Sequence, residues 1–294
     1  MKLTPFDIDQ VVERALAEDL SAGDPTTDGL IPPDLMGRAL VIARADGVLA
    51  GSALSEAVWR RVDPGVVFTV LISDGTTLRG SDPEQGLEGD VIAKVEGPMA
   101  AILKGERTAL NFMQRMSGIA TKTRRYVDAV AAYPAVILDT RKTVPGLRNL
   151  DKYAVAAGGG KNHRRNLGDG ILMKDNHIAA AATYGLTLGQ AIERLRQTAP
   201  HAMKIEVEVE DLAQVDEALA ARAEILLLDN MSTDMMAEAV GRTKGKALTE
   251  ASGSITLENV AEVAATGVDF ISVGALTHSV KALDLSLGAG AAHA

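Results

Sequence analysis

The spacing of apolar residues changes character along the chain. Near the N-terminus apolar residues recur three or four positions apart, which predicts an amphipathic helix over about residues 7–18. From 37 to 95, short β-branched runs are separated by Asp-Gly, Pro-Gly and Glu-Gly-Asp turns, which predicts a small antiparallel sheet. Helical spacing resumes over about 99–132, with a pause at Ser117-Gly118. We expect the boundary between two domains at this pause.

The rest of the chain alternates short apolar runs with helical patterns. Six such runs occur, at 136–138, 171–173, 204–207, 224–228, 246–248 and 270–273. Helical patterns fill the later gaps, and Thr187 with Gln190 forms a predicted capping box at the start of one helix. Strands that alternate with helices build parallel sheets. The span fits a parallel α/β barrel smaller than the usual one of roughly 250 residues, and an open doubly wound sheet is the alternative.

Composition narrows the classes of protein that fit this pattern. Of the 294 residues, 47% are hydrophobic and 23% are charged, which is typical of a globular protein and not of a disordered chain. The formal net charge of −9 disfavours nonspecific binding to nucleic acid or to an anionic membrane. Cysteine is absent, so disulfides, thiolate nucleophiles and cysteine-ligated metals are excluded. No apolar run reaches signal-peptide or membrane-spanning length, and we expect a cytoplasmic protein without nucleic-acid or membrane partners.

Polar residues follow almost every predicted strand. Parallel barrels and open α/β sheets bind their ligands at the carboxyl ends of the strands, where these residues would meet. One polar strand end would indicate little, whereas a full set of them predicts the mouth of an active site. The strand ends are 139–142, 174–177, Glu206 with Glu208, 229–230, 250–253 and 274–275.

Charge is unevenly divided among these strand ends. Between residues 141 and 165 there are seven basic residues and one acidic residue, Asp151. The later strands supply Glu206, Glu208 and Asp229, whose carboxylate oxygens are the hard ligands that Mg²⁺ prefers. A basic half beside an acidic half predicts a multiply anionic substrate next to a metal-bound polyphosphate. The basic residues are Arg141, Lys142, Arg148, Lys152, Lys161, Arg164 and Arg165.

Several polar residues admit more than one role. Lys174 fits a solvated lysine, an anion ligand or a Schiff-base nucleophile, and the neighbouring basic residues favour the anion ligand. The segment 158–164 begins with three glycines, and it is consistent with backbone N–H groups and a guanidinium that bind a carboxylate or phosphate, or with a flexible surface loop. The segments 252–254 and 274–275 lie where barrels commonly bind phosphate. Residues for which a structural role, or a role as partner of the lysines, is the simpler interpretation are His177, His278, Asp175 and Glu250.

Eight long runs of the sequence belong together. They are Glu106 to Phe112, Asp139 to Thr143 with Pro145 to Arg148, Lys152 to Val155, Gly158 to Arg164, Lys174 to His177, Glu206 to Val209, Asp229 to Met231, and Ser272 to Ser279. In this order they closely resemble the family of quinolinate phosphoribosyltransferases. The resemblance covers nearly the whole chain.

The resemblance implies a fold and an assembly. It implies an N-terminal α/β sandwich domain with an antiparallel sheet over 1–116, on which 281–294 packs back. It further implies a catalytic domain over 117–280, an incomplete parallel α/β barrel of about six strands. The assembly would be a homodimer, with a hexamer as the alternative. Each sandwich domain would cover the partner's barrel mouth, so Arg107 would complete the neighbouring active site.

The resemblance also implies a reaction. Quinolinate and phosphoribosyl pyrophosphate would give nicotinate mononucleotide, CO2 and pyrophosphate, as in de novo NAD biosynthesis. Glu208 and Asp229 would hold Mg²⁺, and no organic cofactor is implied, because the N-ribosylated pyridinium is itself an electron sink for decarboxylation. The residues implied at quinolinate are Arg107, Thr140, Arg141, His163, Arg164 and Lys174. Those implied at phosphoribosyl pyrophosphate are Lys142, Glu208, Asp229, Ser252, Gly253, Gly274 and His278.

Two positions depart from the family pattern. An Arg that commonly follows the Tyr-Ala-Val run is Ala156 here, which removes a positive charge near the expected site. A second Gly that commonly follows Ser-Gly is Ser254 here, which would tighten the phosphate loop without removing its N–H donors. The motifs leave open whether Glu206 shares the metal.

Two alternatives remain for the function. One is a paralogous phosphoribosyltransferase of the molybdenum-transport-associated type, which acts on another anionic base or on none. The retained basic residues argue against it, and they are Arg107, Arg141, Arg164 and Lys174. The other is a phospho-metabolite sensor that binds without turnover, and a competent metal site at Glu208 and Asp229 argues against that.

Overall fold

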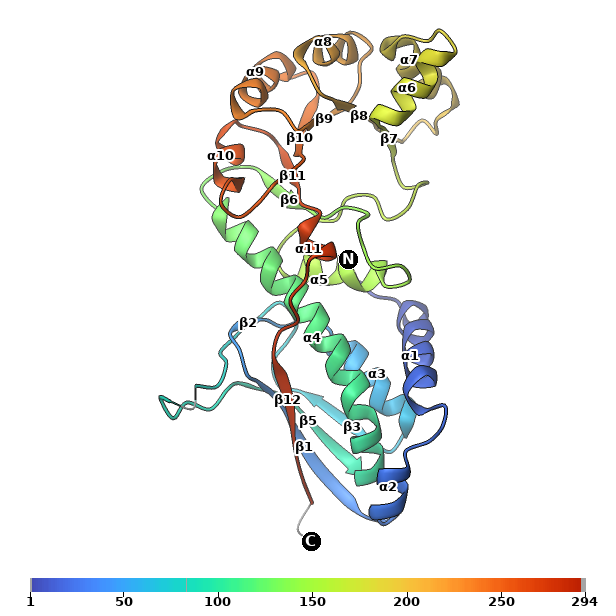
Figure 1. The fold of residues 1–294 in the computed structure, drawn as a ribbon, viewed down its shortest axis with the longest axis vertical. Helices are drawn as coiled ribbons and strands as arrows, with labels where there is room; N and C mark the ends of the chain where they lie inside the picture. Colours follow the sequence, from blue (N-terminus) through green and yellow to red (C-terminus); the bar gives the residue numbers. More distant parts are fainter. Residues whose placement is uncertain (1, 83, 292–294) are drawn as a thin grey trace. The chain divides into compact units, whose positions relative to one another are not determined.

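The computed structural model describes residues 2–82 and 84–291, and its internal contacts divide the chain into two compact units (Figure 1). Unit 2 comprises 125–142 and 160–275. Unit 1 contains the described parts of three segments, 1–124, 143–159 and 276–294. Each unit has its own sheet, antiparallel in unit 1 and parallel in unit 2.

The sheet of unit 1 joins residues from both ends of the chain. Its strand order is β12-β1-β5-β3, and all three pairings are antiparallel, as the turn-rich segment 37–95 predicts. β12 pairs with β1 from Ala43 with Leu285 to Gly37 with Ala291, which brings the C-terminal segment onto this sheet. The three residues that follow β12 lie outside the described part. The strands are β1 (Met36–Ala43), β3 (Val67–Val70), β5 (Val91–Pro98) and β12 (Leu285–Ala291).

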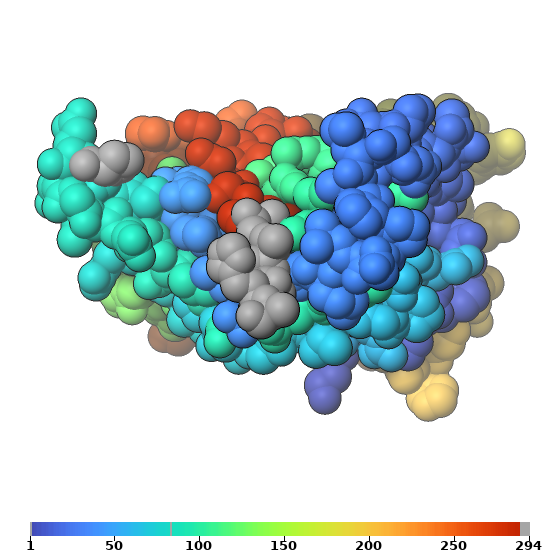
Figure 2. Space-filling model, turned by 90° about the horizontal axis from the view of Figure 1, so that it is seen from below, coloured from blue at the N-terminus to red at the C-terminus, as the bar shows by residue number. Residues whose placement is uncertain are grey.

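A second, two-stranded ribbon extends from unit 1. It pairs β2 (Gly47–Val48) with β4 (Thr77–Leu78). Beyond β4 the chain projects outward through a turn in which Asp82 bridges Leu87, as the cyan segment in Figures 1 and 2 shows. Figure 2 also shows the N-terminal helices, in blue, on the outer surface of this unit.

The helices of unit 1 are placed by caps and by packing. α1 begins with a capping box between Thr4 and Asp7, and it covers the helix expected over residues 7–18. The turn-rich pattern over 37–95 did not predict α3, whose N-terminus is capped by Asp74 and whose Trp59 is completely buried. Its indole donates to the Ile102 carbonyl over 3.0 Å. The helices are α1 (Pro5–Leu20), α2 (Pro25–Leu30), α3 (Ser52–Val62), α4 (Met99–Ala129), α5 (Arg148–Ala157) and α11 (Ala275–His278).

The expected pause in the helix at Ser117-Gly118 is wrong, because α4 continues through it. Ser117 is completely buried, and its hydroxyl bonds both the N–H and the carbonyl of Ala50. A side chain at Gly118 would meet the carbonyl oxygen of Lys281 at 2.2 Å. Both residues thus serve close packing rather than a break in the helix. The domain division at residue 117 remains a prediction.

Unit 2 contains the six expected strands in one parallel sheet, with the order β6-β11-β10-β9-β8-β7. β6 and β7 follow each other along the chain but form opposite edges of the sheet, so the barrel is incomplete. The predicted α/β class, with an incomplete parallel barrel and a separate antiparallel sheet, is confirmed. The strands are β6 (Val136–Leu138), β7 (Ile171–Met173), β8 (Ile205–Val209), β9 (Ile225–Asp229), β10 (Leu248–Ser252) and β11 (Phe270–Ser272).

Helices separate most of these strands, as the sequence predicts. The capping box of Thr187 and Gln190 is present at the start of α7. Among the described residues, no helix has the length and apolarity needed to cross a membrane. The helices are α6 (Asp175–Thr183), α7 (Leu188–Thr198), α8 (Leu212–Ala220), α9 (Thr233–Thr243) and α10 (Val260–Ala265).

Candidate active site

The parallel strands bring their polar ends to one edge of the unit 2 sheet. Glu208 on β8 pairs in register with Leu227 on β9, and Asp229 at the end of β9 pairs with Ser252 at the end of β10. Residues that pair across parallel strands face the same side, as do residues two apart along a strand. Glu208 and Asp229 therefore project from the same face at neighbouring strand ends.

One histidine and two glutamates form a buried cluster on this face. His163 Nε2 lies 3.1 Å from Glu206 Oε2 and 3.6 Å from Glu250 Oε2. Both glutamates are buried, and the Oε1 atom of each has no hydrogen-bond partner in the described part of the chain. Burial and the charge of Glu206 raise the pKa of Glu250 to about 8, so Glu250 keeps its proton at neutral pH. The partner of Glu250 is thus His163 and not a lysine, contrary to one interpretation of the sequence.

Asp139 anchors the segment that carries His163. Its completely buried carboxylate accepts from the His163 backbone N–H over 2.8 Å and from the Asn162 side chain over 2.7 Å. Just before these residues, Lys161 forms a parallel bridge with Leu138 of β6. Residues 161–163 are therefore bound along β6, which disagrees with the flexible-loop interpretation of this segment.

Two arginines of the predicted basic half lie near each other. Burial and the neighbouring charge of Arg141 lower the pKa of the Arg164 guanidinium, and Glu206 acts in the opposite direction. Arg164 Nη1 donates to the Gly170 carbonyl over 3.2 Å. Thr140 and Arg141 follow β6, and the Thr140 hydroxyl accepts a hydrogen bond from the Lys142 N–H over 3.0 Å. The pair Arg141 and Arg164 is a concentration of positive charge suited to an anion with more than one carboxylate.

Lys174 contacts the acidic half directly. Its Nζ lies 3.0 Å from Glu208 Oε2, so its partner is Glu208 and neither Asp175 nor Glu250. The Lys174 side chain is 48% exposed, which does not provide the desolvation that activates a Schiff-base lysine. Its backbone N–H donates to His177 Nδ1 over 3.0 Å at the start of α6, which gives His177 the expected structural role. The anion-ligand interpretation of Lys174 fits these contacts best.

The carboxylates at the ends of β8 and β9 fit a magnesium ion. Glu208 and Asp229 offer hard oxygen ligands from one face, and Asp229 is held by the side-chain amide of Asn230 over 2.7 Å. Glu206 lies two residues before Glu208 on β8 and contacts His163, whereas Glu208 contacts Lys174. The ligand atoms of His163, Glu206 and Glu250 also lie within 4.8 Å of one another, so this group is a second candidate for a cation.

The loops after β9 and β10 contain left-handed backbone. Asn230 after β9 has a φ of 53°, and Gly253 and Ser254 after β10 have φ angles of 89° and 50°. A side chain at Gly253 would meet the backbone N of Asn230 at 2.9 Å. Ser254 therefore occupies, at an energetic cost, a conformation that a glycine adopts freely, which explains why a glycine is common at this place.

Other predicted site residues belong to unit 1. Arg107 on α4 is exposed, with Glu106 at 3.9 Å, and His278 bonds the neighbouring Ser279 hydroxyl. Lys152 on α5, which the sequence analysis counts with the basic half, is completely buried. A side chain at Gly158 would meet the Ala120 carbonyl oxygen at 2.4 Å, which gives this glycine a packing role.

Two residues of the site, Asp139 and Asn162, lie in predicted segments but have roles that the sequence did not indicate. The anchoring roles of Asp139 and Asn162 depend on partners brought together by the sheet, so no local pattern signals them. Glu206 was predicted as a candidate oxygen ligand with Glu208, and it lies two residues before Glu208 and faces the same side. A buried charge two residues below a strand end indicates a partner inside the barrel.

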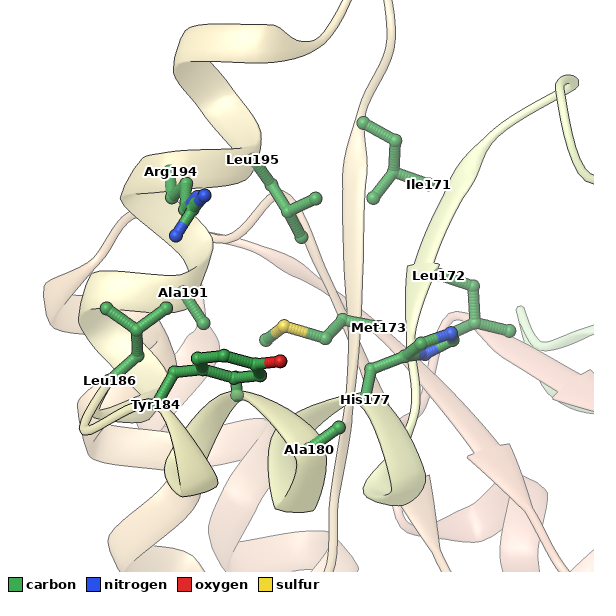
Figure 3. Close-up of a pocket in the computed structure, with 11 residues that line it drawn as sticks. Ile171, Leu172, Met173, His177, Ala180, Tyr184, Leu186, Ala191, Arg194 and Leu195 are labelled. Atoms are coloured by element: carbon green, nitrogen blue, oxygen red, sulfur yellow. The ribbon is translucent and has the colours of Figure 1, made fainter.

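An apolar pocket of about 380 Å³ lies beside the edge strand β7 (Figure 3). α6 and α7 supply most of its walls, and Met173 and Leu195 point toward its centre in the close-up. Tyr184 at its rim is 86% exposed. None of the implied substrate residues lines it, and its apolar walls do not suit a polyanion.

Comparison with known proteins identifies relatives along almost the whole chain. The family models for the N-terminal and C-terminal domains of quinolinate phosphoribosyl transferase match residues 24–117 and 119–288. The chain is 43% identical to a probable nicotinate-nucleotide pyrophosphorylase [carboxylating] of Synechocystis, over 95% of this chain and 92% of that protein. It is 42% identical to the protein of the same name in Bacillus subtilis, over 95% and 92%.

Solved structures agree with these relatives. A nicotinate-nucleotide pyrophosphorylase from Francisella tularensis is 37% identical, with a TM-score of 0.89 over 98% of both chains. The NadC structure from Streptococcus pyogenes is 38% identical, with a TM-score of 0.92 over 100% of both chains. The similarity thus includes both units and is not confined to the barrel.

Proposed function

This chain belongs to the quinolinate phosphoribosyltransferase family, and from that premise we propose how its residues convert quinolinate and phosphoribosyl pyrophosphate to nicotinate mononucleotide, CO2 and pyrophosphate. The activity is that of a decarboxylating pentosyltransferase of NAD biosynthesis. One observation supports it most directly. Arg164 lies near Arg141 and near Glu206, and Glu206 projects from the sheet face that also presents Glu208 and Asp229.

The basic residues would bind and orient quinolinate. Arg141 and Arg164 offer planar N–H donors that suit carboxylates, and Lys174 adds a third cation from the end of β7. Thr140, which precedes Arg141 in the chain, would contribute its hydroxyl. Alignment of two reactants can supply several kcal/mol of the barrier, up to about 7–11 kcal/mol in ideal cases.

The reaction would proceed in two steps. The pyridine nitrogen forms a bond to the ribose C1 atom, while the bond from C1 to pyrophosphate breaks and its electron pair leaves with the pyrophosphate. Glu208 and Asp229 can stabilise the positive charge that develops on the ribose. In the second step the carboxylate next to the nitrogen leaves as CO2, its electron pair remains on the ring, and a proton takes its place. The pyridinium accepts this electron density, so the proposal needs no organic cofactor.

The acidic residues would hold magnesium. Glu208 and Asp229 are its proposed ligands, and phosphate oxygens of the second substrate would complete the shell. When bound, Mg²⁺ offsets the charge of the pyrophosphate group. The remaining residues proposed to bind phosphoribosyl pyrophosphate are Lys142, Ser252, Gly253, Gly274 and His278.

A homodimer would complete the site through Arg107. Support comes from the exposure of this arginine on α4, where Glu106 at 3.9 Å is only a distant charged partner. We expect Arg107→Ala to lose affinity for quinolinate and to keep its fold. Mixing it with Lys174→Ala should restore activity through hybrid dimers, each with one intact site. Verified heterodimers without any restored activity would contradict the shared site.

The activity is tested by measuring nicotinate mononucleotide formation from the two substrates, with and without Mg²⁺, and with nicotinate as the competing base. Product from quinolinate only, and only with metal, is the expected result. A folded sample without product would favour the paralogue or the sensor. Product from nicotinate would mean that the pocket for the second carboxylate is misassigned. The expected cytoplasmic location is also a proposal, which cell fractionation would test.

A further inference from the structure

We propose that Glu206 and Glu250 are positioning residues, which hold Arg164 in its substrate-binding position through the imidazole of His163. The inference rests on the proposed function for the identity of the substrate. The contacts that support it lie within unit 2 and involve no ligand.

Both ring nitrogens of His163 are already engaged inside the protein. Nδ1 accepts the backbone N–H of Arg164 over 2.7 Å, so the ring carries its hydrogen on Nε2. That Nε2–H faces Glu206 Oε2 at 3.1 Å, with Glu250 behind it at 3.6 Å. Both nitrogens thus bond groups of the protein itself, and through Nδ1 the ring holds the backbone of Arg164.

The two glutamates determine the orientation of the ring. A neutral ring can present an acceptor to the Arg164 N–H only when its hydrogen lies on the other nitrogen. Glu206 supplies the acceptor that favours this tautomer, and the protonated Glu250 shares its hydrogen bond with Glu206. A metal ion at Nε2 would displace that hydrogen and move it to Nδ1, where it would oppose the Arg164 N–H.

The backbone on either side of the ring is fixed as well. Asp139 accepts the His163 N–H over 2.8 Å, and the ring accepts the next N–H, that of Arg164. The backbone N–H groups of two consecutive residues are thus held, that of His163 by Asp139 after β6 and that of Arg164 by the imidazole ring. The Arg164 side chain is then aligned by the Gly170 carbonyl at 3.2 Å.

Electrostatics give the same assignment. Two arginines that lie close together repel each other, and partial burial makes their charges more costly. Glu206 stabilises the Arg164 guanidinium against the effects of burial and of Arg141. Loss of Glu206 would therefore release both the ring and the guanidinium from their present positions.

The first test reads the tautomer of His163 directly and needs no substrate. The chain has 5 histidines, so their ring nitrogens can be assigned by long-range ¹H–¹⁵N correlation, with His163→Gln to identify the signal. We expect Nε2–H with an unprotonated Nδ1 in the wild-type protein, and mixed tautomers in Glu206→Ala. The opposite tautomer, or a spectrum unchanged by Glu206→Ala, would overturn the proposal.

The second test measures binding of each substrate by calorimetry. Glu206→Ala should weaken quinolinate binding about tenfold, the equivalent of one lost hydrogen bond, and leave phosphoribosyl pyrophosphate binding within about twofold. Glu206→Gln keeps an acceptor for the Nε2–H of His163 and should restore most of the affinity for quinolinate. Glu250→Gln resembles the protonated carboxyl group and should bind quinolinate within about threefold of the wild-type affinity. The matched control is Glu224→Ala, since Glu224 bonds Arg196 and the Ile205 N–H at the opposite end of the strands.

A double-mutant cycle separates positioning from direct contact. If Glu206 acts through Arg164, Glu206→Ala should have little further effect on quinolinate binding in an Arg164→Lys background. Additive losses, equal losses for both substrates, or the same loss in the Glu224→Ala control would overturn the proposal. Should Glu206→Ala not fold, the tautomer of the wild-type protein still decides, and a hydrogen on Nδ1 of His163 would overturn the proposal. A wild-type protein that binds no quinolinate would refute the proposed function and leave the tautomer test standing.

Discussion

Removal of Arg115 should destabilise unit 1, because it takes away a guanidinium that bonds both oxygens of a buried carboxylate. Asp151 on α5 is completely buried. Arg115 on α4 donates to both of its oxygens, with distances of 2.9 and 3.0 Å from Nη2 and 3.2 Å from Nε. The Val144 N–H is a further donor at 3.2 Å and remains after the substitution.

The magnitude follows from this burial. Removal of one partner of a buried ion pair typically costs 3–5 kcal/mol, and the retained Val144 N–H places Arg115→Leu near the lower end, at about 3 kcal/mol. Asp151→Asn in the same background should recover part of that loss, because the buried charge is then gone. The exposed pair of Arg61 and Glu13 is the matched control, and Arg61→Leu should cost less than about 1 kcal/mol.

The assay is urea unfolding followed by tryptophan fluorescence. The chain has 1 Trp, and Trp59 is completely buried in unit 1, so the signal reports on this unit. The free energies of unfolding of the four proteins, wild type, the two single arginine variants and the double variant, are compared under one set of conditions. Arg115→Leu with a cost no larger than that of Arg61→Leu would refute the reasoning.

Three further predictions concern a loop, a carboxyl group and a helix contact. Ser254→Gly should stabilise the protein by about 0.5–1 kcal/mol, measured as a higher midpoint of thermal unfolding, because Ser254 has a φ of 50°; an unchanged or lower midpoint would contradict this. The pKa of Glu250 is raised from 4.5 to about 8, so the folded state keeps a proton that the unfolded chain loses between these values. The free energy of unfolding should therefore fall as the pH rises from 4.5 to about 8. Glu250→Gln should remove this part of the decline in denaturation experiments at a series of pH values, and a pH profile parallel to that of the wild type would count against the prediction. Gly158→Ala should lower the free energy of unfolding by about 1–3 kcal/mol in chemical denaturation, because its Cβ would collide with the Ala120 carbonyl oxygen. An unchanged free energy of unfolding would show that α4 and α5 can move apart without cost.

Much of the candidate site could be predicted because its residues follow strands that are recognisable locally. The apolar runs before Asp139, Lys174 and Asp229 correspond to β6, β7 and β9. Parallel strands place their carboxyl ends together, so a list of strand ends is already a list of candidate site residues. The family motifs then added roles that the spacing alone left open.

The partners within the site could not be predicted in the same way. Glu250 was an equal candidate for a lysine partner, and it faces His163 instead. Lys152 looked like one more cation of a basic half, and it is completely buried. Charge counting treats all nearby basic residues alike, whereas burial and pairing depend on which element faces which.

The sequence by itself determined the elements that depend on contacts close in the chain: the capped helices α1 and α7, the six strands of unit 2, and the α/β class. The spacing of apolar residues and the capping of helices depend on residues close together in the sequence, so they can be recognised without knowing the fold. Only the tertiary structure decided the pairing of β12 with β1, the continuity of α4 through Ser117-Gly118, and the union of His163 with Glu206 and Glu250. Each of these joins segments far apart in the chain, and their free energy comes from burial and close packing that exist only after the chain has folded.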